Sequence, residues 1–112
     1  MTGAENDPRK FIIGWFRCRP GKRDELMSLA MSYAANCRQE EGCLFFEMNP
    51  CLEDSDSVSV VECFSSEEAH AAHLETAHAQ TFFAEIPRLC QDGKFHHIFP
   101  ARVISESPTF SE

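Results

Sequence analysis

The apolar side chains of this 112-residue chain follow two different periods, and the order in which those periods occur limits the folds available to it. A period of two indicates a β-strand, and apolar residues at i, i+3, i+4 and i+7 indicate a helix with one buried face. The strand pattern covers residues 11–18, 43–49, 58–64 and 94–104, and the helical pattern covers residues 22–40 and 66–90.

This order of elements, strand–helix–strand–strand–helix–strand, is typical of the split βαβ or ferredoxin-like fold of the α+β class. In such a fold two helices cover one face of an antiparallel sheet. The chain is long enough for one such domain, which we expect over residues 9–104. We expect a flexible N-terminal arm at residues 1–8 and a polar C-terminal tail at residues 105–112.

Local signals predict how the helices begin and end. Ser65 and Glu68 match a capping box, which would start the second helix. Thr76 can cap a new segment, so we expect that helix to break there, and Pro87 should kink its later part. Gly42 is expected to end the first helix as a left-handed cap.

The second face of the predicted sheet is apolar, although two helices can cover only one face. It carries Phe11, Ile13, Trp15 and Phe45. An exposed apolar face of this size marks an association surface, and a symmetric dimer is the commonest way to bury it. We therefore expect a homodimer that packs sheet against sheet.

Composition excludes several classes of function. The formal net charge of −8 disfavours nucleic-acid binding, although Arg17, Arg19, Lys22 and Arg23 form a local basic cluster that could hold a small anion. No apolar run approaches the roughly 20 residues that span a membrane, and the polar, acidic start is unlike a signal peptide, so we expect a cytoplasmic protein. The six cysteines show no metal-binding or disulfide pattern and are expected to be free, mostly buried thiols.

Four short motifs, in this order, resemble the antibiotic biosynthesis monooxygenase (ABM) domain of the dimeric α+β barrel superfamily. They are Arg19-Pro20-Gly21-Lys22, Glu41-Gly42-Cys43-Leu44, Glu62-Cys63-Phe64 and His73-Leu74-Glu75-Thr76-Ala77-His78. The resemblance covers residues 9–103. It implies a small-molecule enzyme of the oxidoreductase class and a homodimer.

The resemblance also excludes some of the activities found in the family. Haem-degrading members have an asparagine where this chain has Gly14, a tryptophan where it has Phe64 and a haem-binding histidine near Phe83, so that activity is not expected. Isomerase-like members share Glu40-Glu41-Gly42 and the His73…Thr76…His78 stretch, but they usually have proline where this chain has Ala77. We expect no haem, flavin or metal cofactor, because the histidines and cysteines lack ligand spacing along the sequence.

The candidate catalytic residues are His73, Glu62 and His78. His73 should face the sheet, where Glu62 could fix its tautomer and raise its pKa, whereas His70 should turn toward solvent. The alternative is that Glu62 and His73 only brace the helix, and that His78 only caps it. Of His96 and His97, which alternate in direction, one should point inward. Five aromatic residues either form the core or line a substrate pocket: Phe16, Phe46, Phe64, Phe82 and Phe83.

Three functions fit these features. One is a cofactor-independent monooxygenase that deprotonates a small aromatic or quinol-type substrate, which then reacts directly with O2. Another is an isomerase or tautomerase of a small hydroxyketone, similar to enzymes that degrade an autoinducer, with the same base. The last is a non-enzymatic small-molecule-binding barrel, because the fold alone does not decide among them.

Overall fold

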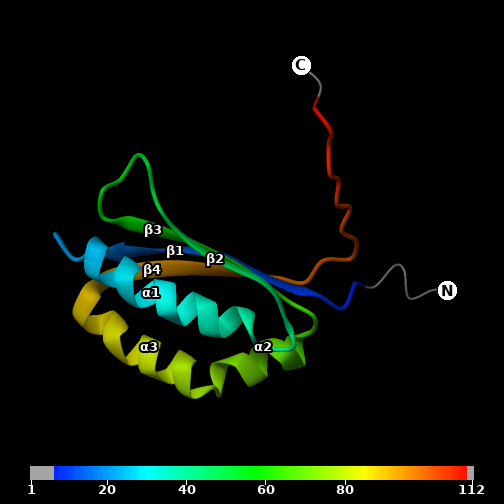
Figure 1. The fold of residues 1–112 in the computed structure, drawn as a ribbon, viewed down its shortest axis with the longest axis horizontal. Coiled ribbons are helices and arrows are strands. Elements are labelled where there is room, and N and C mark those ends of the chain that lie inside the picture. The colour runs from blue at the N-terminus through cyan, green and yellow to red at the C-terminus, as the bar shows by residue number, and fades with distance from the viewer. Residues whose placement is uncertain (1–6, 111–112) are drawn as a thin grey trace.

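The computed structural model describes residues 7–110, which form one four-stranded antiparallel sheet with three helices packed on one face (Figure 1). The strands lie in the order β2-β3-β1-β4. In chain order the elements are β1 (Lys10–Cys18), α1 (Arg23–Arg38), β2 (Cys43–Pro50), β3 (Ser57–Phe64), α2 (Glu67–Leu74), α3 (Ala77–Leu89) and β4 (Cys90–Ile98). The predicted ferredoxin-like α+β fold is confirmed.

The core lies between the sheet and the helices. Alternate residues of β1, among them Ile12 and Phe16, point into it, and β1 pairs with β3 on one side and β4 on the other. From α1 the predicted stripe supplies Leu26, Ala30 and Tyr33. Since strand side chains alternate in direction, this packing leaves the other residues of β1 on the far face of the sheet.

The second helix breaks at Thr76, as predicted, because two local hydrogen bonds stabilise the break. The Thr76 hydroxyl donates to the carbonyl of His73 at 2.7 Å and accepts from the amide of Ala79 at 3.2 Å. The prediction that Ser65 caps α2 is wrong by one residue, since the Ser66 hydroxyl accepts from the Ala69 amide at 3.0 Å. Pro87 lies inside α3, near its C-terminal end.

The end of the first helix and the start of the last strand also differ from their predicted positions. The first helix ends at Arg38 with Gln39 as its C-cap, and Gly42 does not have the positive φ that a left-handed cap requires. The last strand begins at Cys90 rather than at residue 94, because residues 92 and 93 pair with β1 instead of forming a turn. It ends at Ile98, which pairs with Phe11 near the start of β1, so almost no partner strand remains beyond it.

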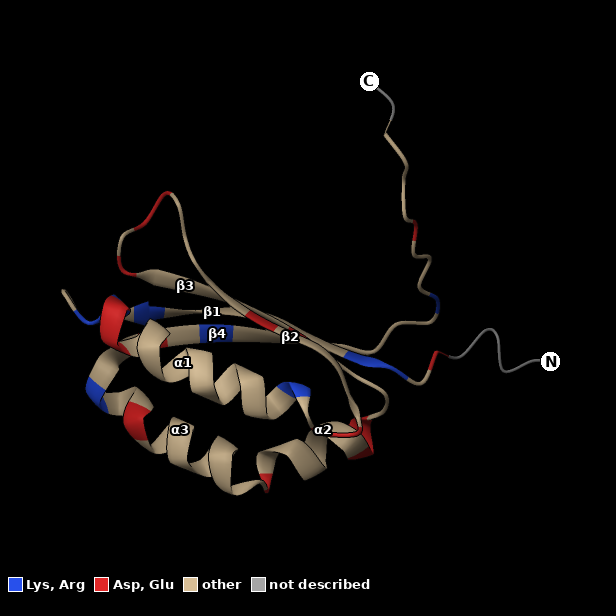
Figure 2. Cartoon of the chain, viewed as in Figure 1, with Lys and Arg blue, Asp and Glu red and all other residues tan. Residues whose placement is uncertain are grey.

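Most Lys, Arg, Asp and Glu positions fall at the ends of helices and strands and in the loops (Figure 2). The basic cluster near β1 is engaged within the fold. Arg19 donates to the carbonyl of Pro87 at 3.0 Å, and Arg23 donates to the carbonyl of Asp54 at 2.8 Å. Arg17 lies 3.6 Å from Asp92. Through these contacts the basic side chains stabilise the β1–α1 turn, so the cluster is not open to bind an anion.

The far face of the sheet is apolar and only partly covered. Ile13 is 44% exposed and Phe45 is 38% exposed, with Phe11 and Trp15 half-buried beside them. Figure 1 places all three helices on the opposite side.

Residues 1–6 of the expected arm and residues 111–112 of the expected tail lie outside the described residues. Residues 105–110 form no helix or strand. Cys18, Cys37, Cys63 and Cys90 are buried and all six thiols are free. Within the described part of the chain, no helix combines the length and apolarity needed to cross a bilayer.

Candidate functional site

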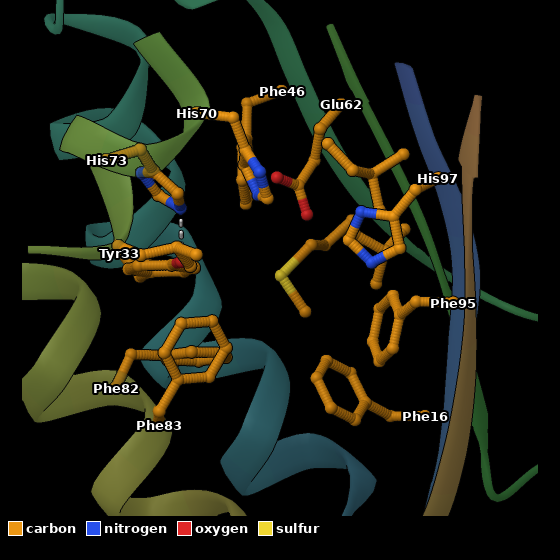
Figure 3. Close-up of a pocket in the computed structure, with 14 residues that line it drawn as sticks. Phe16, Tyr33, Phe46, Glu62, His70, His73, Phe82, Phe83, Phe95 and His97 are labelled. Carbon is orange, nitrogen blue, oxygen red and sulfur yellow. Dashed lines mark hydrogen bonds between the residues drawn. The ribbon is translucent and has the colours of Figure 1, made fainter. Parts of the chain in front are cut away.

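A cavity of about 180 Å³ lies between the sheet and the helices (Figure 3). Aromatic and aliphatic side chains form most of its wall, and the polar groups come from a few residues on both layers. Its lining residues are Ile12, Phe16, Tyr33, Phe46, Met48, Val60, Glu62, His70, His73, Leu74, Phe82, Phe83, Phe95 and His97. An apolar pocket with a few polar groups is the usual form of a small-molecule site.

Glu62 is the polar group of the cavity whose hydrogen bonding is incomplete. It extends from β3 and is buried, and its Oε1 is the single buried side-chain oxygen or nitrogen within residues 7–110 that has no hydrogen-bond partner. Burial, reinforced by the charge of Glu40, raises the pKa of Glu62 to about 7, although Lys10 lowers it. The carboxyl can therefore gain or lose a proton near neutral pH.

His70 lies in the cavity wall, so the prediction that it turns toward solvent is wrong. It is buried and its ring lies 5.1 Å from that of Phe64. His70 and His73 are three residues apart in α2, so they share one face of the helix, and both are buried there. Burial and the positive charge of Lys10 lower the pKa of His70 to about 4. Lys10 Nζ lies 3.0 Å from His70 Nδ1, which therefore accepts this hydrogen bond in the neutral imidazole.

His73 is fully buried at 1% exposure, but its acidic partner is not the one expected. Its Nδ1 lies 2.9 Å from Glu40 Oε2, and its Nε2 lies 3.1 Å from the hydroxyl of Tyr33. The expectation that Glu62 fixes the His73 tautomer is therefore corrected to Glu40, which follows α1 and lies beneath α2. Both ring nitrogens of His73 are engaged in this chain of hydrogen bonds.

His78 belongs to the same cluster and does not line the cavity. Its Nε2 lies 2.6 Å from the Glu40 oxygen that also contacts His73. Cys37, buried one turn before Glu40, brings its sulfur into the group, so that the four ligand atoms lie within 4.8 Å of one another. Among the described residues, these four form the group with the donors and spacing to hold a metal ion.

Four of the five phenylalanines predicted for the pocket line it, namely Phe16, Phe46, Phe82 and Phe83. Phe64 is instead fully buried behind His70 and His73. Of the histidine pair on β4, His97 lines the cavity.

Sequence reasoning missed three contributors, Tyr33, Glu40 and Phe95. Tyr33 stacks on Phe82 with ring centroids 4.0 Å apart, and it is the one tyrosine of the chain. The apolar stripe of α1 predicts Tyr33 only as a core residue, and its hydroxyl is the sequence signal of a second role. Glu40 belongs to the Glu40-Glu41-Gly42 motif that resembles the isomerase-like members, and this motif is the sequence signal that could have placed Glu40 at the site.

Strands β1 and β4 approach each other closely at Gly14. A Cβ atom there would lie 2.2 Å from the carbonyl oxygen of Lys94 and 2.5 Å from the ring of Phe95. An asparagine, as in the haem-degrading relatives, would clash with the β4 backbone at this position.

Comparisons with known proteins agree with this fold. The family model described as antibiotic biosynthesis monooxygenase matches residues 11–85. The Bacillus subtilis (strain 168) protein named "Putative monooxygenase YcnE" is 31% identical over 74 residues, which cover 66% of this chain and 78% of that protein.

Two solved structures have the same fold. A Chloroflexus aurantiacus protein named for the same family superposes with a TM-score of 0.76 at 26% identity, covering 88% of this chain and 97% of its own. Rv0793 of Mycobacterium tuberculosis superposes with a TM-score of 0.77 at 20% identity, covering 89% and 99% respectively. The family match spans more than half of the chain, so the chain belongs to the antibiotic biosynthesis monooxygenase family.

Proposed function

We propose that this protein is a cofactor-independent monooxygenase that acts on a small aromatic or quinol-type substrate. The observation that carries the proposal is the buried carboxyl of Glu62, which lacks a hydrogen-bond partner at Oε1 and lines an aromatic cavity. A general base works best when its pKa lies near the operating pH, and burial raises the pKa of Glu62 to about 7. Membership of the family supports the reaction type.

The reaction requires one base and O2 as oxidant. Glu62 takes a proton from the substrate, and the resulting carbanion transfers electrons to O2 and forms a carbon–oxygen bond. At a CH2 group beside an aromatic ring, the peroxide then loses water to give a ketone. The substrate supplies all four electrons, and one oxygen atom enters the product while the other leaves as water.

The remaining polar residues have positioning roles in this proposal. His73 hydrogen-bonds to Tyr33 and so fixes the tyrosine hydroxyl at the cavity wall, while Glu40, which also contacts His78, holds His73. With both nitrogens engaged, His73 has no free lone pair for a substrate proton. Burial and Lys10 lower the pKa of His70 to about 4, so it stays neutral near pH 7 and brings no positive charge of its own to the cavity.

The cavity favours an uncharged, single-ring substrate. At about 180 Å³ it is close to the roughly 150 Å³ of an engineered protein cavity that binds benzene. Its lining residues, all in the described part of the chain, include no lysine or arginine to pair with a phosphate. This composition favours the monooxygenase over an isomerase of a phosphorylated hydroxyketone, although Glu62 could also transfer a proton beside the carbonyl of an uncharged ketone.

The test is oxygen consumption by the purified protein with a panel of single-ring hydroquinones and phenols. We expect stoichiometric O2 uptake, with kcat/KM rising as pH increases through about 7, because Glu62 must be ionised to accept a proton. Glu62→Gln should lower turnover by roughly 10²–10⁴-fold. Glu47→Gln, at an exposed position of β2, is the matched control and should leave turnover unchanged.

Two results would contradict the proposal. One is the absence of substrate-dependent O2 uptake across the panel. The other is full turnover by Glu62→Gln on a substrate that the protein oxidises. Proton exchange into an uncharged ketone, without O2 uptake, would support the isomerase instead.

We also propose that two copies of the chain pack through the apolar sheet face that carries Ile13, Trp15 and Phe45. The support is the exposure of these apolar side chains on the face that the helices leave open.

The cytoplasm is the proposed compartment, supported by the use of Cys18, Cys37, Cys63 and Cys90 as buried core residues with free thiols.

A further inference from the structure

We propose that Cys37, Glu40, His73 and His78 bind one divalent transition-metal ion of the zinc type in tetrahedral geometry. The four residues come from the last turn of α1, the segment that follows it, α2 and the first turn of α3, and their donor atoms lie within 4.8 Å of one another. They are too far apart in the sequence to show ligand spacing, and the fold brings them together.

The donor set matches the chemistry of zinc. Thiolate sulfur, imidazole nitrogen and carboxylate oxygen are the ligands that zinc takes in proteins, and four protein ligands are typical of a structural site. A thiolate and a carboxylate carry two negative charges, which balance the charge of a divalent ion. Cys37 and His73 are fully buried, at 0% and 1% exposure, so their side of the site is closed to water.

Small movements would bring the donors to coordination distances. Zinc–ligand bonds of about 2.0–2.3 Å place tetrahedral donors about 3.3–3.8 Å apart. Glu40 Oε2 now lies 2.9 Å from His73 Nδ1 and 2.6 Å from His78 Nε2, so these atoms must separate, and the most distant pair must approach by about 1 Å. Glu40 lies outside a helix and His78 is partly exposed, and both can rotate by this amount.

Metal binding would reverse one hydrogen bond at the cavity. Without the ion, His73 Nδ1–H donates to Glu40 and Nε2 accepts from the Tyr33 hydroxyl. With the ion on Nδ1, the ring proton moves to Nε2, which then donates to the Tyr33 oxygen. The hydroxyl hydrogen of Tyr33 becomes free to turn toward the cavity. The Cys37 thiol loses its proton to solvent, so one proton is released for each ion bound.

The ion has a route to the site from solvent. The side chains of Glu40 and His78 are 15% and 25% exposed. His78 also lines an open groove between α1 and α3, beside Asn36 and Ala77. The ion would enter from this groove and reach the buried thiol last.

The experiment is a titration of the chelator-treated, full-length protein with Co²⁺, a spectroscopic substitute for Zn²⁺. We expect the intense visible bands of tetrahedral cobalt and a near-ultraviolet thiolate-to-cobalt charge-transfer band, both saturating at one ion per chain. Added Zn²⁺ should bleach both. The spectra are recorded without substrate and do not depend on the proposed oxygenase reaction.

Matched variants assign the ligands. Cys37→Ser should lose the charge-transfer band, whereas Cys51→Ser, which changes a thiol outside the cluster, should retain it. His78→Asn should weaken binding at least about tenfold, whereas His96→Asn should not. Circular dichroism checks that each variant is folded, and if Cys37→Ser is not, the partly exposed His78 still provides the test.

Two outcomes would overturn the proposal. One is that one equivalent of Co²⁺ gives only the weak spectrum of hydrated, octahedral cobalt. The other is that the charge-transfer band persists in folded Cys37→Ser.

Discussion

At the scale of single residues, the proposed function depends on which partners the fold places beside a few ionisable groups. Glu62 and Glu40 are both carboxylates beneath the helices, yet Glu40 contacts two imidazoles while Glu62 Oε1 has no partner. An unpartnered buried carboxylate is costly when charged, so the protonated form is favoured. The same arrangement that suits Glu62 for proton transfer therefore makes folding stability depend on pH.

We predict that Glu62 destabilises the protein as the pH rises. Its pKa is raised from 4.5 to about 7 in the folded protein, so the folded state holds the proton over a range where the unfolded state has lost it. The free energy of unfolding should fall between these two pH values by roughly 3 kcal/mol from this group. Glu62→Gln should remove that dependence.

Urea unfolding of both proteins at pH values of about 5 and about 8 measures the difference, and the other titrating groups cancel between them. Equal pH dependence of the two proteins would contradict the assignment of this raised pKa to Glu62.

We predict that Lys10 contributes to the low pKa of His70. Burial is the larger cause and the ammonium 3.0 Å away is the next. Lys10→Met should therefore raise the pKa of His70 from about 4, while burial keeps it below 6.5. A histidine NMR titration measures the change. Lys94→Met, on an exposed part of β4, is the control and should leave His70 unchanged.

The residue-level site was only partly predictable from the sequence. His73, Glu62 and His78 were identified as candidates, and four of the five phenylalanines line the cavity. The pairing of His73 with Glu40 rather than Glu62 was not predictable, because it depends on how the segment after α1 passes beneath α2. The orientation of His70 was also missed, because residues three apart share one face of a helix and both His70 and His73 lie on the buried face of α2.

At the scale of secondary-structure elements, the break between α2 and α3 positions the histidine cluster. The break sets His73 at the end of one helix and His78 in the first turn of the next, so both reach Glu40. The threonine signal for this break was readable in the sequence because a cap acts through local hydrogen bonds. The residue at which β4 ends could not be predicted from the sequence, because it depends on where the partner strand β1 begins.

We predict that Thr76→Ala lowers the free energy of unfolding by about 1 kcal/mol, because the Ala79 amide and the His73 carbonyl each lose a hydrogen-bond partner. Thr81→Ala, at an exposed position inside α3, is the control and should be neutral or slightly stabilising. Thermal or urea unfolding provides the measurement. Equal effects of the two changes would show that Thr76 does not act as a cap.

We predict that Ala77→Pro stabilises the protein by about 0.4–1 kcal/mol. Ala77 is the first residue of α3, where a proline is well tolerated, and Thr76 before it has the extended φ of −68° and ψ of 150° that a residue preceding proline prefers. Urea unfolding measures the gain. A loss of stability would mean that the Ala77 amide makes a contact that proline cannot replace.

At the scale of the whole molecule, the sheet divides a packed face from an open one. Alternation along β1 gives one row of side chains to the core and the other to the far face, and this division follows from the strand period alone. The sequence therefore predicted both the layered fold and the exposed apolar face.

We predict that the wild-type chain is a dimer in solution at micromolar concentration and that Ile13→Asp or Phe45→Glu converts it to a monomer. A buried, unpaired carboxylate would be strongly unfavourable at the proposed contact. Met31→Glu is the control, since Met31 is 75% exposed on α1, away from the sheet. Analytical ultracentrifugation gives the mass. A wild-type protein that is monomeric at this concentration would contradict the proposed contact.

The burial of the thiols has a consequence for how the protein reacts chemically. Burial raises the pKa of Cys37 and of Cys90 to about 12, and that of Cys43 to about 11, so the thiolate that alkylating reagents attack is scarce at these positions while the chain is folded. Cys51, half-buried in the loop after β2, is the accessible contrast. An added alkylating reagent would therefore modify Cys51 first, and the four buried thiols, Cys18, Cys37, Cys63 and Cys90, at the rate at which the structure opens. The alkylation rate of the buried thiols would thus report the rate of unfolding, and the alkylation rate of Cys51 in the same molecule would serve as the fast reference.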